Sequence, residues 1–179
     1  MSVTSTELAS HRFAAGLTAP QLDRLAAIAA SVELAADTRL FDEGGQAASL
    51  WLIRSGRIAL DLHVPGRDRL IVETLGPGDE LGLSWLVSPP RWQFGAVVQL
   101  AASAFELTAA AVTSLCESDH ELGYQVTRRL LDTAIGRLQA ARIRILDLYA
   151  APPRATPSSG APARGGPARG GPALPGGSP

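Results

Sequence analysis

Three short stretches decide the fold of this chain: Leu40-Phe-Asp-Glu-Gly44, Leu50-Trp-Leu-Ile-Arg-Ser-Gly56 and Leu75-Gly-Pro-Gly-Asp-Glu-Leu-Gly82. Each joins apolar residues to a glycine-bearing turn signal, a pattern typical of short β-strands. Two more apolar runs, 57–62 and 70–72, lie between the same kinds of turn. The turn signals are residues 43–45, 55–56, 65–68 and 76–79. Short strands at this spacing, from about residue 32 to 107, predict an antiparallel β-sandwich or roll.

Helical patterns flank the predicted strands on both sides. Residues 18–30 form an amphipathic pattern that begins at Thr18, a favourable N-cap, with Pro20 in the first turn. After the strands, 109–116 predict a short helix, and Asp119 caps a long helix over about 119–149. The sequence therefore predicts a mainly β domain with flanking helices and a long C-terminal helix.

The long predicted helix carries an apolar seam at alternating spacings of three and four residues, as in a coiled coil. Its members are Leu131, Ala134, Leu138, Ala141, Ile145 and Leu148. The seam either packs on the domain's own sheet or pairs with the same helix of a second copy. We favour the homodimer, because the alternating alanines permit close approach of two helices.

The composition changes at the end of this helix. Residues 151–179 consist almost entirely of Pro, Gly, Ala, Ser and Arg, which bury too little surface to offset the entropy of ordering. We therefore divide the chain into an N-terminal extension (1–12), one domain (13–150) and a disordered tail (151–179). The tail is interpreted as a solvated segment, with an Arg-bearing tether for acidic partners or RNA as the alternative.

Composition and charge exclude several classes of protein. Residues 1–150 hold 13 Arg against 17 Asp and Glu, a formal charge of −4, which does not suit a duplex-DNA-binding surface. The first residues do not resemble a signal peptide, and no apolar run is long enough for a membrane span. The single cysteine, Cys116, excludes an intramolecular disulfide and suits a cytoplasmic location. The three histidines show no metal-ligand spacing, and no catalytic motif is present, so we predict neither a metal site nor an enzyme.

The order of helix, glycine-punctuated strands, short helix and long helix resembles the cyclic-nucleotide-binding domain of Crp/Fnr regulators and kinase regulatory subunits. The resemblance covers about residues 13–149 and is carried by the three stretches quoted above. It implies a cyclic-nucleotide-binding β-roll, similar to a jelly roll. The regulators in this family carry a winged-helix DNA-binding domain after the long helix, and residues 151–179 do not resemble one. The resemblance therefore implies a sensor without direct sequence-specific DNA binding.

The same resemblance places the ligand cassette at residues 82–96. A cyclic phosphate needs backbone N–H donors at a tight turn and an Arg, and the ribose hydroxyl needs an acceptor, normally a Glu. Gly82 and Ser84 match this family cassette, whereas Leu83 stands where the Glu is expected. Arg91 follows Gly82 by nine residues, at the short end of the family spacing.

Two interpretations of the cassette remain open. In the strand that follows, the alternate residues Phe94, Ala96 and Val98 are expected to face the interior. Extending this alternation backwards places Trp92, and not Arg91, at the inward position. Either Arg91 reaches a phosphate after a one-residue adjustment, or Trp92 has replaced the Arg and the pocket is partly apolar. The expected ligand-binding residues are Gly82, Leu83, Ser84, Trp85, Arg91, Trp92 and Gln93.

The segment 82–94 also resembles a bacterial subgroup of Crp/Fnr-like proteins with a Ser-Trp-Leu, Pro-Pro, Arg-Trp and Phe signature. This similarity extends to Asp119–Tyr124 and Arg137–Arg142, and in this subgroup the missing Glu is normal. No resident cofactor is implied. The alternatives for the site are a cyclic nucleotide, another small anionic or aromatic molecule, or a pocket closed by the protein's own tryptophans.

Two functions follow from these observations. The first is a ligand-responsive regulatory module that signals through its long helix to a homodimer or a partner protein. The second is a ligand-free interaction or scaffold module on the same fold. Neither involves a membrane.

Overall fold

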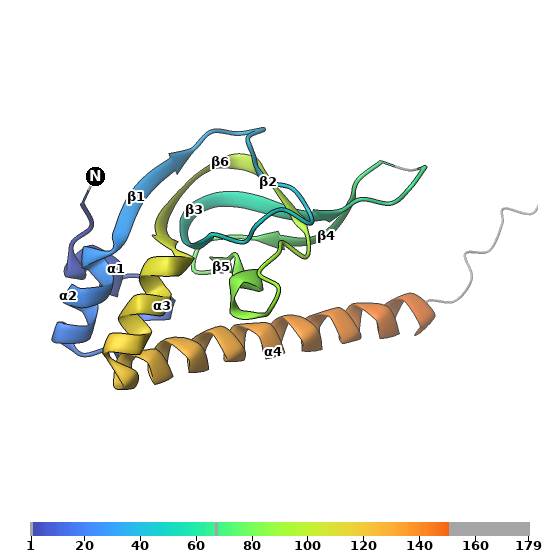
Figure 1. The fold of residues 1–179 in the computed structure, drawn as a ribbon. Helices are drawn as coiled ribbons and strands as arrows, with labels where there is room; N and C mark the ends of the chain where they lie inside the picture. The colour runs from blue at the N-terminus through green and yellow to red at the C-terminus, as the bar shows by residue number, and fades with distance from the viewer. Residues whose placement is uncertain (1, 67, 151–179) are drawn as a thin grey trace, which may run out of the picture. The chain divides into compact units, whose positions relative to one another are not determined.

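The computed structural model describes residues 2–66 and 68–150, with no side chains described for residues 148–150. It confirms the predicted β-roll with flanking helices and a long C-terminal helix (Figure 1). The predicted tail, 151–179, lies outside the described residues. The elements in chain order are α1 (Ser5–Ala9), η1 (Arg12–Ala14), α2 (Ala19–Ala27), β1 (Ala29–Leu34), β2 (Arg39–Phe41), β3 (Ser49–Leu62), β4 (Leu70–Leu75), β5 (Glu80–Leu81), η2 (Leu83–Leu86), β6 (Gly95–Thr108), α3 (Ala109–Ser118) and α4 (His120–Ala150).

The strands form one antiparallel sheet that is rolled around two long central strands. The main order is β1-β6-β3-β4, β2 also pairs with β6, and β5 also pairs with β3. The 14-residue strands β3 and β6 pair along almost their whole length, from Leu50 opposite Leu107 to Leu60 opposite Ala96. The short strand β5 pairs with β3 next to Gly82, so the candidate cassette emerges directly from the centre of the roll.

One predicted turn is wrong. Ser55-Gly56 does not separate two strands but lies inside the continuous strand β3. The register of β3 against β6 shifts on both sides of Ser55. Gly56 has a φ of +83°, and a Cβ there would lie 2.3 Å from the carbonyl oxygen of Ala101. The glycine therefore marks a β-bulge that bends the strand, a role that shares its sequence signal with a turn.

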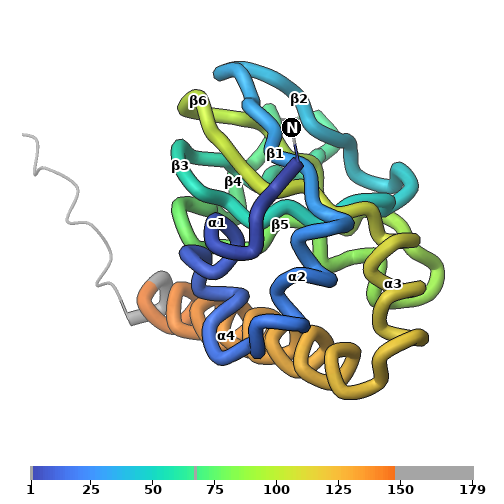
Figure 2. Tube along the Cα trace, turned by 90° about the vertical axis from the view of Figure 1, so that its left-hand side faces the viewer, coloured from blue at the N-terminus to red at the C-terminus, as the bar shows by residue number. Residues whose placement is uncertain are grey.

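Buried side chains form two hydrophobic clusters. One lies inside the roll, and the other joins α1, η1 and α2 to the ends of β3 and β6, α3 and the first half of α4. Figure 2 shows these helices gathered at one end of the sheet. The segment that we separated as an extension contributes to the second cluster, since Val3 and Leu8 are buried beside Phe13. Partly buried Trp85 packs against both clusters.

The chain divides into two compact units, Met1–Arg142 and Ile143–Pro179. Helix α4 crosses this division. Within the first unit, α4 buries Leu122, Val126 and Leu130, which repeat every four residues. The seam predicted from the sequence lies on another face: Leu131 is 55% and Leu138 is 51% exposed, and Ala134 is exposed as well. Further along the helix Ala141 and Ile145 are also exposed, and the side chain of Leu148 lies outside the described part of the structure.

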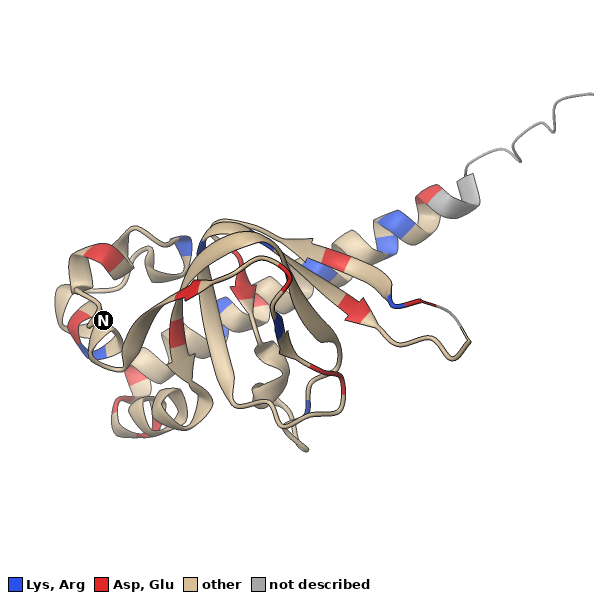
Figure 3. Ribbon diagram, turned by 90° about the horizontal axis from the view of Figure 1, so that it is seen from above, with Lys and Arg blue, Asp and Glu red and all other residues tan. Residues whose placement is uncertain are grey.

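Arginine and acidic side chains are interspersed along the described chain (Figure 3). Several are held in ion pairs: Arg39 pairs with Asp42 and with buried Asp61, and Arg69 pairs with the same two acids. None of the described helices combines the length and the apolar character that crossing a membrane requires.

Candidate functional site

Gly82 connects β5 to η2 in a conformation that only glycine adopts without strain. Its φ is +97°, and a Cβ would lie 2.4 Å from the carbonyl oxygen of Ser49 and 3.3 Å from the indole ring of Trp92. The chain can therefore pass closely over β3 and turn directly into η2, which holds Leu83, Ser84, Trp85 and Leu86. This turn supplies the tight backbone expected of the cassette.

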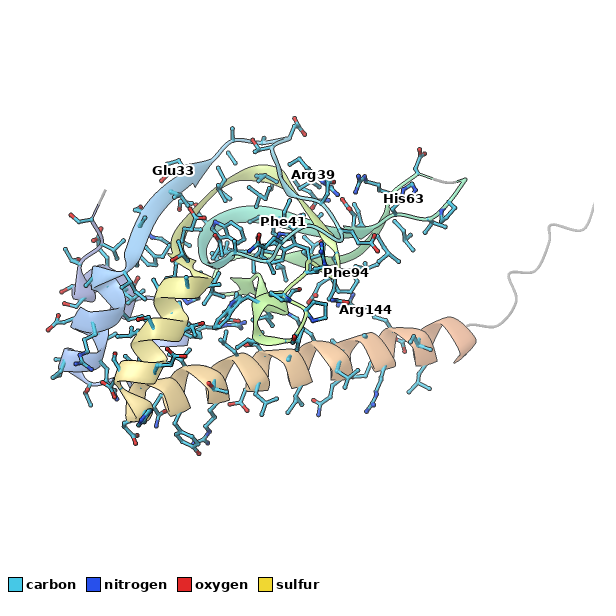
Figure 4. All side chains as sticks on the ribbon, in the orientation of Figure 1. Glu33, Arg39, Phe41, His63, Phe94 and Arg144 are labelled. Atoms are coloured by element: carbon cyan, nitrogen blue, oxygen red, sulfur yellow. The ribbon has the colours of Figure 1, made fainter. Side chains whose placement is uncertain are left out.

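Trp92 fills the interior of the roll beside this turn. It is 6% exposed and stacks on Phe41, with ring centroids 3.9 Å apart. Trp51 lies next to both rings, 6.0 Å from Trp92 and 5.7 Å from Phe41. Figure 4 shows Phe41 among the strands of the roll. Backbone hydrogen bonds of 2.8 Å from the Trp92 N–H to Gly45 O and from the Gly44 N–H to Trp92 O hold the segment in place.

Arg91 lies outside this cluster. Its side chain is exposed and donates a 2.8 Å hydrogen bond to the carbonyl oxygen of Gly44. Ala96 and Val98 are buried, as the inward parity predicts, but Phe94 precedes β6 and is 38% exposed. Of the two neighbouring residues, Trp92 is therefore the buried one and Arg91 the exposed one.

The remaining cassette residues close the loop between η2 and β6. The Gln93 N–H lies 3.4 Å from Ser84 Oγ, and the Gln93 side chain donates to Arg91 O at 3.2 Å. Leu83 is partly buried against the helical cluster, and Trp85 stands over the junction of both clusters. The structure thus brings Gly82, Ser84, Trp92 and Gln93 together and directs Arg91 away from them.

Sequence reasoning missed the most buried acid next to the cassette. The turn signal at residues 76–79 ends in Asp79, whose Oδ2 accepts a 2.8 Å hydrogen bond from the Gly76 N–H, as a turn residue does. Glu80 instead is 2% exposed, and its Oε2 accepts a 2.9 Å hydrogen bond from Thr133 Oγ1 on α4. Burial of a carboxylate requires such partners.

Two arginines complete the surroundings of Glu80. Arg137 on α4 donates to the Glu80 carbonyl oxygen and lies 3.6 Å from Glu73 of β4, while Arg12 lies 3.5 Å from the Glu80 carboxylate. The spacing of Thr133 and Arg137, four residues apart on one helix face, is the only sequence signal for this contact. Through Glu80, the strand that carries Gly82 is bonded directly to α4.

A buried histidine supports the same strand region. His11 is 5% exposed; the Phe13 N–H donates to Nδ1 at 3.2 Å, so Nε2 carries the proton and donates to Ile53 O at 3.1 Å. Burial lowers the pKa of His11, an effect that Arg12 reinforces and that nearby Glu80 and Asp79 oppose. A protonated ring would lose the acceptor that Phe13 uses.

We expect the stability of the fold to fall as the pH decreases below about 6.5. In that range the unfolded His11 binds a proton while the folded one, with its lowered pKa, does not, so unfolding is favoured; above it both states are neutral and the effect vanishes. Urea unfolding midpoints at pH 7.5 and 5.5 measure the difference. His11→Gln, which retains an N–H donor, should reduce the difference, whereas His63→Gln at an exposed position should not. An unchanged difference in His11→Gln would contradict this account.

Comparison with known proteins assigns the fold. Residues 31–119 match the family model of the cyclic nucleotide-binding domain, a range that begins within β1 and includes all of α3. Among curated proteins, no sequence is significantly similar to the chain.

Solved structures show the same arrangement of strands and helices at low sequence identity. A candidate cyclic nucleotide-binding protein from Geobacter metallireducens aligns with a TM-score of 0.68 at 23% identity, over 76% of this chain and 98% of its own. The N-terminal domain of a transcriptional regulator from Streptomyces coelicolor aligns with a TM-score of 0.59 at 19% identity, over 86% of this chain and 99% of its own. The catabolite activator protein of Thermus thermophilus aligns with a TM-score of 0.63 at 20% identity, over 76% of this chain and 62% of its own.

Proposed function

From a chain whose residues 31–119 form a cyclic nucleotide-binding domain, we propose a non-enzymatic, ligand-responsive regulatory module with an altered ligand cassette. The module signals through α4 to a second copy of the chain. The observation that carries the proposal is the bond between Glu80, two residues before Gly82, and Thr133 of α4. A ligand that displaces Gly82 or η2 acts on β5, and β5 is bonded to the helix.

The state of the cassette supports the altered site. Trp92 occupies the inward position next to Gly82, Leu83 has no acceptor for a ribose hydroxyl, and Arg91 is bonded to Gly44 O. A ligand-binding surface of this kind lacks the charge that a cyclic phosphate needs. The proposed effector is therefore a small molecule that contacts the cassette without depending on an inward Arg.

The exposed seam of α4 supports the dimer. Leu131 and Leu138 are more than half exposed, and large apolar side chains repeated along one helix face are typical of a helix-pairing surface. The neighbouring side of the helix, with Leu130 and Thr133, is already used by the domain. The helix thus has one face bonded to the cassette strand and one face free for a second copy.

We expect Leu138→Glu to weaken the dimer about 30-fold while leaving the melting temperature of the monomer unchanged. Each exposed Leu contributes roughly 1 kcal/mol when a dimer buries it, and a twofold dimer contains the residue twice. Sedimentation velocity over a concentration series measures the dissociation constant. Gln139→Glu, the adjacent exposed position, is the matched control and should have a much smaller effect. A wild-type protein that stays monomeric at about 100 μM, where even a weak interface is occupied, would contradict the dimer.

The second candidate is a ligand-free interaction module. The aromatic stack of Phe41, Trp51 and Trp92 supports this candidate, because it fills the interior of the roll beside the cassette, where a bound ligand is expected in this fold. In this case the cassette is a structural element and α4 docks a partner protein. A small molecule that binds at the cassette and changes the dissociation constant of the dimer would exclude this candidate.

A further inference from the structure

A cavity of about 360 Å³ lies between η2 and the helices α3 and α4. Its size is in the range of small-molecule sites. It does not coincide with the interior of the roll, which Trp92 fills, but is on the helical side of η2. Trp85 and Leu86 form the η2 wall, and α3 and α4 form the facing wall.

The helical wall is fixed by a close approach of its two helices. Gly123 of α4 faces Cys116 of α3 so closely that a Cβ on Gly123 would lie 2.8 Å from the Cys116 carbonyl oxygen. Burial raises the pKa of the Cys116 thiol, so this side chain presents a neutral surface to the cavity. The η2 wall is held less firmly, since Leu86 is 41% exposed and Trp85 is only partly buried.

The groups that line the cavity disfavour an anionic ligand and favour an aromatic one. Thr113, Glu117, His120 and Thr127 surround an apolar floor that includes Val126, and none of the lining residues is an Arg. A phosphate or carboxylate placed here would meet the Glu117 carboxylate without a guanidinium to compensate it. A neutral or positively charged molecule gains from the same carboxylate, and a flat apolar ring suits the indole of Trp85.

Trp85 provides an independent indication of a ligand. Its Nε1 is the one buried side-chain nitrogen or oxygen without a hydrogen-bond partner among the described residues. An unsatisfied buried donor is unfavourable, so the Trp85 ring gains when it moves to a position where its N–H meets an acceptor or water. A ligand that packs on the Trp85 ring and shifts it would relieve this cost, and the shift would act on both hydrophobic clusters, against which the ring packs.

We propose that this cavity binds a neutral or singly cationic aromatic small molecule, with its ring against Trp85 and its amine or hydroxyl group facing Glu117. The inference rests on the proposed function and deepens it, because it gives the effector a place and a chemical class. The ligand lies between the cassette helix η2 and α4 without entering the roll.

Three probes with one ring system and different charges test the proposal: tryptamine, tryptophol and indole-3-acetate, with cyclic AMP as a fourth. The ¹⁵N-labelled full-length chain has three indole N–H signals, and Trp85→Phe assigns that of Trp85. We expect saturable shifts of this signal with tryptamine and tryptophol, with tryptamine about threefold tighter. Indole-3-acetate should bind at least about tenfold more weakly than tryptamine, and cyclic AMP should leave the signal unchanged.

Two variants make the result specific to the cavity. Glu117→Gln should equalise the affinities for tryptamine and tryptophol, while Glu33→Gln on β1, outside the cavity, should not (Figure 4). Thr127→Phe fills the cavity and should abolish the shifts, while Gln139→Phe further along α4 should not.

The failures of the two proposals are distinguishable. A saturable shift with cyclic AMP but not with tryptamine, or equal affinities for the three indole probes, overturns the inference and leaves a ligand-responsive module. Binding of tryptamine to a chain that does not dimerise supports the cavity and overturns the signalling route through α4.

Discussion

Gly82→Ala is expected to destabilise the chain by about 2–5 kcal/mol, a large part of the stability of an ordinary domain. The left-handed backbone at φ +97° contributes about 1–2 kcal/mol of this loss. The overlap of the new methyl group with Ser49 O, 2.4 Å away, contributes about 1–3 kcal/mol. Because the obstructing atom belongs to the backbone of the central strand β3, it cannot move aside as a flexible side chain would. Equilibrium unfolding in urea measures the change.

Gly44→Ala separates the two contributions. Gly44 also has a positive φ, +80°, but no atom lies within 4 Å of the position that a Cβ would take, so only the backbone cost applies. We expect it to lose about 1–2 kcal/mol. Equal losses in the two variants would show that the turn at Gly82 relaxes away from β3, which contradicts the close passage described above.

The glycine turns explain why the fold was predictable. Gly44, Gly78 and Gly82 each adopt a positive φ, and their order with the apolar runs between them is a long-range pattern that few folds share. The ends of the long helix were predicted within one residue. Its start is marked by Asp119, which accepts a 3.0 Å hydrogen bond from the Leu122 N–H, as an N-cap does. Gly56 shows the limit: a bulge and a turn require the same residue, and only the pairing partner distinguishes them.

The candidate site was predictable only in part, because its identity depends on contacts between distant residues. The alternation of the strand indicated that Trp92 faces inward. Its stacking partner Phe41, however, lies on β2, far from Trp92 in the sequence. Glu80 directly follows the turn signal 76–79, and its partner Thr133 lies on α4, more than fifty positions later in the sequence. The cavity beside Trp85 is likewise lined by residues of η2, α3 and α4, whose mutual placement local sequence does not encode.

These contacts together assign different roles to the two tryptophans of the cassette. Trp92 is buried in an aromatic stack and fixes the roll, whereas Trp85 is partly buried and lies between the roll, the helices and the cavity. A ligand at Trp85 can therefore act on η2 and α4 without opening the roll. This division predicts different outcomes when each ring is removed.

Trp92→Ala is expected to cost about 3–5 kcal/mol, the range found when a large aromatic side chain is removed from a core. The loss comes from the cavity left beside Phe41, Trp51 and Gly82, since neighbouring strands cannot close over a space of this size. Trp85→Ala should cost clearly less, because that ring is partly exposed. Urea unfolding of both variants gives the comparison.

Rescue with free indole then identifies the space. Indole fits the shape that the Trp92 side chain leaves, so millimolar indole should raise the unfolding midpoint of Trp92→Ala by mass action, whereas cyclic AMP should not, because Arg91 remains bonded to Gly44 O outside the roll. The wild-type chain serves as the reference for binding at other places. Two results would contradict the interpretation that Trp92 is part of the core of the roll: a Trp92→Ala variant no less stable than the wild type, or stabilisation by cyclic AMP equal to that by indole. In either case the roll is an accessible nucleotide pocket that Trp92 merely covers.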